Sequence, residues 1–241
     1  MESGQFVEVT PHIAKLDLSL SGGAMPVGVW LVRDASDWSL IDTGSPKDAA
    51  VIEQAVVAYT NGQVPKQIIL THGHYDHAGS VALLQQRWGI PVLAHPAEVP
   101  LMTGEAGYGS VRPTWWGYQL LQIIAALGGR VTPVSVATTL ADGDAIAGMD
   151  VRHVPGHTPG MIALIHRADR AIIAGDTFIS KAGRLTPPIA FFTPDRRAAI
   201  RSMAKLAYED FDHLLASHGR PILHSGRQEA ERAARVAASK T

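Results

Sequence analysis

The hydrophobic pattern of the first forty residues has the two-residue period of β-strands. Apolar and polar residues alternate loosely over residues 6–20, as expected for a bent strand. Residues 27–32 and 38–41 are more continuously apolar and flank the turn-forming segment 34–37. Because a short polar turn between two apolar runs favours an antiparallel pair, we expect a β-hairpin here.

Beyond this hairpin, the period lengthens and the pattern predicts helices and strands in alternation. Ser45 and Pro46 have the character of a cap and a first helical residue, so we expect a helix that ends near Tyr59. An apolar strand over residues 66–70 is followed by a glycine-bearing loop and a helix over residues 80–88, a succession typical of α/β architecture. The same reasoning predicts strands at 91–94, 151–154 and 171–174, a helix capped by Thr193 that ends near Glu209, and a helix capped by Ser225.

Composition narrows the class of protein. The 241 residues are 46% hydrophobic and 18% charged, which supplies a sizeable core and argues against disorder. The net charge of −1 offers no basic excess for nucleic acid or an anionic membrane. No apolar run approaches the roughly 18 residues that span a bilayer, and the N-terminus does not resemble a signal peptide. We therefore expect a single cytoplasmic domain over residues 1–241 with a small-molecule partner.

One segment, at about residues 102–130, departs from the α/β rhythm. A glycine-rich stretch is followed by Trp115, Trp116 and a run of apolar residues. Long insertions are often functional, which favours a lid, but aromatic stripes more often pack in a core or a subunit interface, which leaves a homodimer open. Together with Phe191 and Phe192, the two tryptophans are candidates for an apolar substrate pocket.

The strongest chemical signal is a cluster of metal-ligand residues directly after the strand at 66–70. His72, His74, Asp76 and His77 form an H-x-H-x-D-H motif, expected by chance on the order of 0.001 times in such a chain. In an extended loop, alternate histidines lie on one side, while Asp76 and His77 turn toward a second position. The motif therefore favours two neighbouring metal sites over one.

Three further residues end apolar runs beside a glycine, where a turn can present a ligand. These are His157, Asp176 and His218. The chain has no cysteine, so thiolate ligands and thiolate nucleophiles are excluded. Four isolated histidines lie in polar contexts and are expected to be solvated or hydrogen-bonded: His12, His166, His213 and His224.

An H-x-H-x-D-H motif followed by His, Asp and His at intervals of 80, 19 and 42 residues resembles the signature of the metallo-β-lactamase superfamily. Leu40-Ile-Asp42-Thr-Gly44 upstream is also similar. The resemblance covers about residues 6–222 and implies an α/β fold, a four-layer αβ/βα sandwich with its site along one edge of two facing sheets. It implies that His72, His74 and His157 bind a first metal, that Asp76, His77 and His218 bind a second, and that Asp176 bridges the two.

The cofactor that this resemblance implies is a pair of zinc ions, although iron or manganese would accept the same ligands. A metal-bound hydroxide would then be the nucleophile at neutral pH. Asp76 is a candidate catalytic residue if it also holds the attacking water or accepts its proton. Asp42 is expected either to orient a ligand histidine or to serve as a turn carboxylate after its strand.

Within the superfamily, the sequence looks most like glyoxalase II, lactonases and small metallo-hydrolases. It does not look like a true zinc β-lactamase, because those use a cysteine ligand or lack the bridging aspartate. The resemblance implies a binuclear hydrolase that cleaves an ester, thioester or lactone bond. The alternatives are a mononuclear iron dioxygenase acting on persulfides, a β-lactam hydrolase and a non-catalytic binding protein. Metal content and a substrate panel discriminate among them.

Overall fold

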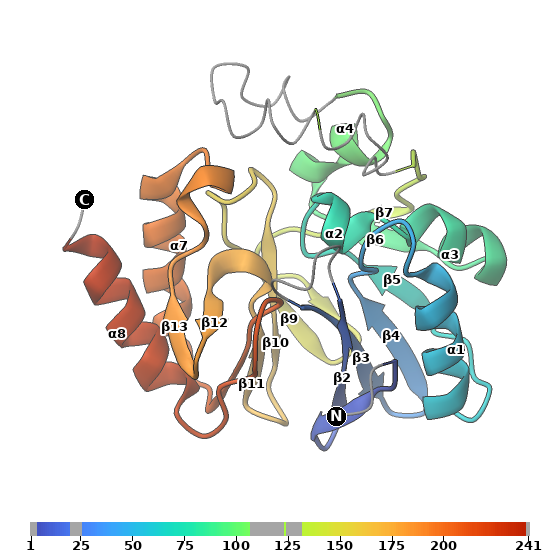
Figure 1. The fold of residues 1–241 in the computed structure, drawn as a ribbon, viewed down its shortest axis with the longest axis horizontal. Helices are drawn as coiled ribbons and strands as arrows, with labels where there is room; N and C mark the ends of the chain where they lie inside the picture. The colour runs from blue at the N-terminus through green and yellow to red at the C-terminus, as the bar shows by residue number, and fades with distance from the viewer. Residues whose placement is uncertain (1–3, 20–25, 107–122, 124–131, 240–241) are drawn as a thin grey trace. The chain divides into compact units, whose positions relative to one another are not determined.

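The computed structural model describes residues 4–19, 26–106, 123 and 132–239 (Figure 1). The chain divides into two compact units, Met1–Leu140 and Ala141–Thr241, each with its own sheet and hydrophobic core. The predicted insertion lies largely outside the described residues, and Trp115 and Trp116 fall in the part that is not described. In the described part of the chain, no helix combines the length and the apolar character that crossing a bilayer requires.

The first unit is built on a seven-stranded sheet. In spatial order its strands are β1 (Val7–Thr10), β2 (Ile13–Leu18), β3 (Val27–Asp34), β4 (Asp37–Ile41), β5 (Gln67–Ile69), β6 (Val92–Ala94) and β7 (Thr138–Thr139). The predicted hairpin is confirmed, since β3 and β4 pair antiparallel as far as Asp34 and Asp37. The predicted bent strand is two paired strands, β1 and β2, with an irregular register between Glu8 and Thr10. From β4 to β7 the strands are parallel, so their carboxyl ends lie at one edge of the sheet.

Helices α1 (Ala49–Tyr59) and α3 (Val81–Trp88) pack on one face of this sheet. Their buried side chains, among them Ile52 and Leu84, join Leu31 and Ile68 of the sheet in one core. The helix start predicted at Pro46 is wrong. The Ser45 backbone N–H and hydroxyl both donate to Asp48 Oδ2, at 2.8 and 2.6 Å, so residues 45–48 form a turn and α1 begins after it. Shorter helices are α2 (Tyr75–Ala78), η1 (Pro96–Glu98) and α4 (Val99–Met102).

The second unit contains a five-stranded sheet and a separate hairpin. The sheet comprises β14 (His213–Leu215), β11 (Ala171–Ile173), β10 (Ile162–His166), β9 (Met149–His153) and β8 (Ala145–Ile146), and the hairpin β12 (Ile179–Lys181) and β13 (Arg184–Thr186). Strands β8 to β11 form an antiparallel meander, and only β14 joins in parallel. We expected a helix after each of the strands at 151–154 and 171–174, and this is wrong between the two strands. Strand β10 connects them in the chain and pairs antiparallel with both β9 and β11.

Helices α7 (Arg196–Ala207) and α8 (Gly226–Ala238) cover one face of the second sheet and share its core. Ser225 occupies the N-cap position of α8, as predicted, but its side chain makes no capping hydrogen bond. Thr193 does not cap α7. Asp195 caps α7 instead, since its Oδ1 accepts the Ala198 N–H at 2.9 Å. The Thr193 hydroxyl contacts His157.

Candidate metal centre

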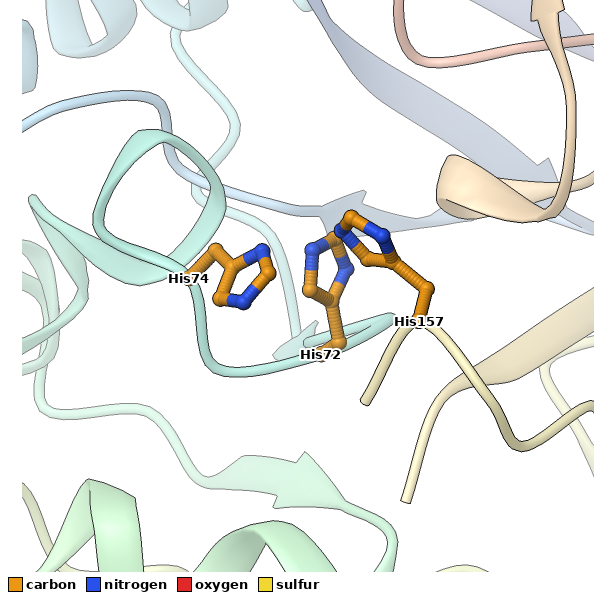
Figure 2. A group of neighbouring side chains, drawn as sticks. All are labelled: His72, His74 and His157. Carbon is orange, nitrogen blue, oxygen red and sulfur yellow. The ribbon is translucent and has the colours of Figure 1, made fainter. Parts of the chain in front are cut away.

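The H-x-H-x-D-H motif follows β5 at the carboxyl edge of the first sheet. The predicted extended loop contains one helical turn, α2, which begins directly after His74. Figure 2 draws His72 and His74, whose ring centroids lie 4.7 Å apart, and the His77 ring lies 4.1 Å from that of His72. The Asp76 Oδ2 lies 3.8 Å from His77 Nε2. The first unit thus gathers the four residues that the motif predicted.

A glycine and a buried glutamate shape this loop. A Cβ on Gly73 would lie 2.7 Å from Leu101 Cδ2 and 2.9 Å from Glu98 Oε2, so a larger residue there would force these two side chains to move. The Gly73 N–H donates to Glu98 Oε2 at 2.8 Å, and Glu98 is buried. Sequence reasoning missed Glu98, because it belongs to no motif and reaches the loop only through the turn of η1.

Asp42 connects two of the histidines. Its Oδ2 lies 3.0 Å from His77 Nδ1, and its two oxygens accept the Thr71 N–H and the Thr71 hydroxyl, both at 2.8 Å. Since the single hydroxyl proton of Thr71 is given to Asp42, Thr71 Oγ1 accepts from His72 Nδ1 at 3.1 Å. In the neutral rings, the Nε2 atoms of His72 and His77 therefore carry the lone pairs that a metal requires. The expectation that Asp42 orients a motif histidine is confirmed, and Thr71 is an addition that the sequence did not reveal.

Tyr75 lies inside the motif and is half-buried. Burial raises the pKa of its phenol, and the neighbouring charge of Asp76 raises it further. The phenol therefore keeps its proton at neutral pH and offers a hydrogen-bond donor, not a negative charge, beside the histidines.

The second unit gathers the other three predicted ligands. His157 follows β9 (Figure 2), Asp176 lies in η3 (Gly175–Thr177), and His218 follows β14. The Asp176 Oδ2 lies 3.4 Å from His157 Nε2 and also 3.4 Å from His218 Nε2. All three side chains are buried.

These two distances fit metal ligands better than direct hydrogen bonds. A charge-assisted N–H to carboxylate bond is about 2.7–2.9 Å long, shorter than the 3.4 Å observed. Two ligand atoms at about 2.0–2.1 Å from a tetrahedral ion lie about 3.3–3.4 Å apart. Imidazole nitrogen and carboxylate oxygen are also the donors that zinc, iron and manganese accept. The residues of this unit therefore suit a divalent transition metal.

Two glycines allow the turns that carry His157 and His218 to pack closely against other backbone segments. Gly156 has a φ of +135°, and a Cβ there would lie 2.2 Å from the Ala199 backbone nitrogen at the start of α7. Gly219 has a φ of +95°, and its Cβ would lie 1.9 Å from the Ser180 carbonyl oxygen. The prediction that glycines allow these ligand turns is confirmed at both positions.

Phe191 and Phe192 lie in η4 (Ala190–Phe192), with perpendicular rings whose centroids are 4.8 Å apart. Both are half-buried and present part of their apolar surface to solvent. A small, mostly apolar cavity of about 60 Å³ lies beside this segment. It is lined by Pro187, Pro188, Thr193, Arg196, Ala199, Ile200 and Ala237.

The expectation that His166 is solvated or hydrogen-bonded is confirmed, because it accepts a hydrogen bond, but its expected surface-like context is wrong. His166 is buried at the end of β10, and its Nδ1 accepts the Asp169 N–H at 3.2 Å. The Asp169 carboxylate lies 3.6 Å from the same nitrogen. Polar neighbours in the sequence suggested a solvated side chain, but the position of His166 on a central strand buries it.

In each unit, histidine and aspartate side chains that suit a metal lie close to the ends of strands of a mixed sheet. This combination is typical of a metal-binding α/β protein. The chain belongs to the Metallo-beta-lactamase superfamily, whose family model matches residues 22–218. The "Probable metallo-hydrolase YflN" of Bacillus subtilis (strain 168) is 31% identical and aligns over 80% of each chain. The "Probable metallo-hydrolase YybB" of the same organism is 31% identical over 90% of this chain and 92% of its own.

Among solved structures, TTHA1623 "in a di-iron-bound form" is similar with a TM-score of 0.65 and 24% identity, over 88% of this chain and 98% of that one. The predicted metallo-β-lactamase fold is thereby confirmed. The chain is a member of a metallo-hydrolase superfamily with candidate histidine and aspartate metal ligands.

Proposed function

We propose that this protein is a binuclear metal-dependent hydrolase that cleaves an ester, thioester or lactone bond. The observation that carries the proposal is the distance of 3.4 Å from one Asp176 oxygen to each of two imidazole nitrogens, which suits a carboxylate that ligates a metal together with each histidine. His72, His74 and His157 hold one ion, Asp76, His77 and His218 hold the other, and Asp176 bridges them.

Two comparisons support this proposal. The relatives YflN and YybB bear the description of probable metallo-hydrolases, and TTHA1623 is described as binding two irons. Zinc is our first choice for this chain, because neutral imidazoles dominate its ligand set. Iron or manganese would accept the same donors.

Bound divalent ions lower the pKa of water and polarise a substrate carbonyl, which is the chemistry that hydrolysis needs. The protein residues supply position and proton transfer. Asp42 holds His77 directly and His72 through Thr71, so both rings keep one orientation. The Asp76 carboxylate is proposed to hold the attacking water and to accept its proton.

The substrate is proposed to carry an apolar acyl or lactone chain. Phe191 and Phe192 present aromatic surface in the same segment as Thr193, which contacts His157. Ligand pockets are mostly apolar with few polar anchors. Each buried methylene contributes about 0.8 kcal/mol, roughly fourfold in binding, so activity should rise with chain length until the pocket is full.

Elemental analysis combined with a panel of esters, thioesters, lactones, β-lactams and persulfides tests the proposal. We expect about two transition-metal ions per chain and hydrolysis of at least one carbonyl substrate class. One iron per chain with oxygen consumption on persulfides would identify the dioxygenase instead. Hydrolysis confined to β-lactams would contradict the proposed bond type.

The chain-length preference is tested with the variant Phe191→Ala in a homologous ester series. We expect the variant to flatten the dependence on chain length while metal content stays at the wild-type level. Tyr208→Ala is the matched control, because Tyr208 is an aromatic side chain that is 86% exposed. An unchanged preference in Phe191→Ala would remove Phe191 from the pocket.

A further inference from the structure

Thr193 lies directly against the imidazole of His157. Its Oγ1 is 3.2 Å from His157 Nδ1, and the same hydroxyl donates to the Ile189 carbonyl oxygen at 2.8 Å. Thr193 is only 1% exposed and His157 only 3% exposed, so the contact is shielded from water. No motif contains Thr193, and the sequence suggested a helix cap there instead.

The single hydroxyl proton of Thr193 determines which ring nitrogen of His157 carries a hydrogen. A threonine hydroxyl has one proton, and the shorter contact gives it to Ile189. Thr193 Oγ1 is then left as an acceptor toward His157, so His157 Nδ1 carries the hydrogen. In the neutral imidazole, the Nε2 atom then keeps its lone pair and lies 3.4 Å from Asp176 Oδ2. Two electron-rich atoms at that distance repel unless a cation lies between them.

The segment that carries Thr193 is attached to the His157 turn by further contacts. The Asp195 N–H donates to the Gly156 carbonyl at 3.2 Å, and the Ser202 hydroxyl of α7 donates to the Pro155 carbonyl at 2.7 Å. The residues before His157 are therefore fixed to the segment that follows Thr193. The hydroxyl of Thr193 is held at a defined position relative to the imidazole.

We infer that Thr193 is a positioning residue that keeps the proton of His157 on Nδ1 and turns Nε2 toward Asp176 as a metal ligand. The inference rests on the proposed function only in that the ligand is for a metal ion. Without the hydroxyl acceptor, the imidazole proton is expected to move to Nε2, where it can point to Asp176 Oδ2. That proton must then be displaced before a metal can bind.

The test compares Thr193→Val, Thr193→Ser and the control Thr186→Val in the full chain. Thr186 is a half-buried threonine of the same unit whose hydroxyl also donates to a carbonyl, that of Ile179 at 3.2 Å. The first readout is the dissociation constant for Zn²⁺, measured by competition with a chromophoric chelator. The second is the ¹⁵N shift pattern of His157 in metal-free protein at about pH 8, which distinguishes the two neutral tautomers.

Thr193→Val should weaken Zn²⁺ binding by about 10 to 100-fold, as is typical when a partner of a ligand histidine is lost. Thr193→Ser should restore both the affinity and the Nδ1–H tautomer, and Thr186→Val should leave both unchanged. An Nε2–H tautomer in the wild-type protein would overturn the inference even if no variant folds. Equal Zn²⁺ affinity in wild type and Thr193→Val would also overturn it while leaving the hydrolase proposal intact. A wild-type chain that binds no metal would defeat that proposal, and the tautomer would still decide the role of Thr193.

Discussion

The carboxylate of Asp42 lies 3.0 Å from Nδ1 of His77, although the two residues are 35 positions apart in the chain. The link arises because β4 and β5 are parallel neighbours, so the residues that follow them meet at one edge of the sheet. Asp42 adopts a positive φ of 61° there, and both of its oxygens accept hydrogen bonds from Thr71. One carboxylate thereby orients two histidines of the motif.

Replacing Asp42 with Asn should weaken metal binding by about 10 to 100-fold, because the amide removes the charge that holds the Nδ1 proton of His77. Competition with a chromophoric chelator measures the change. Asp37→Asn is the matched control, since Asp37 lies at the other end of β4 and is solvent-exposed. Equal losses in the two variants would mean that Asp42 acts only through general electrostatics.

The two acidic candidate ligands, Asp76 and Asp176, should respond differently to Asn substitution. Asp176→Asn removes the negative charge near both His157 and His218, so metal occupancy and turnover should fall together. Asp76→Asn should reduce turnover more than occupancy, because we propose that Asp76 also accepts a proton from water. Elemental analysis and steady-state kinetics on the same samples measure both quantities. Parallel losses in Asp76→Asn would leave Asp76 a ligand only.

Removing metal should lower the melting temperature. The candidate ligands come from separate loops, and a bound cation would stabilise the buried lone pairs and carboxylates of each loop. Binding at a free metal concentration of 100 times the dissociation constant adds about 2.7 kcal/mol to the free energy of unfolding. Calorimetry before and after treatment with a chelator, followed by readdition of Zn²⁺, checks this expectation. A melting temperature indifferent to metal would contradict it.

Glu229 should make the second unit sensitive to acid. Its carboxylate accepts the Arg232 guanidinium at 2.9 Å and the Leu185 N–H at 3.3 Å. The Arg232 hydrogen bond, against a partial opposing effect of burial, lowers the pKa of Glu229 below its ordinary value of 4.5. A lowered folded-state pKa gives stability above the ordinary pKa, and this stability is lost as the pH falls through the folded-state pKa.

Glu229→Gln should therefore cost about 1 kcal/mol of unfolding free energy at pH 7 and less below about pH 4. Urea unfolding at pH 7 and at pH 3.5 measures the difference. Glu231→Gln on the same helix is the control, because its partners Arg227 and Arg235 form more exposed pairs. A loss in Glu229→Gln that does not change with pH would show that the charge of Glu229 is not responsible.

A candidate metal site and the local elements that present it could be predicted from the sequence. The H-x-H-x-D-H spacing places four candidate ligands in one loop, and the hairpin of β3 and β4 follows from the short turn between two apolar runs. These features depend on neighbours within a few residues, where side-chain period and turn chemistry act directly. The helix start at Ala49 was missed, because Asp48 competes for the Ser45 groups that a cap would use.

The residues that orient the candidate ligands could be identified only from the folded structure. Glu98, Thr71 and Thr193 act through hydrogen bonds whose partners lie in other loops or depend on how a turn folds back, and nothing in their own sequence context marks them. The antiparallel return of β10 and the burial of His166 likewise depend on strand order. Strand order is set by the packing of distant apolar residues, which a local pattern of residues does not encode.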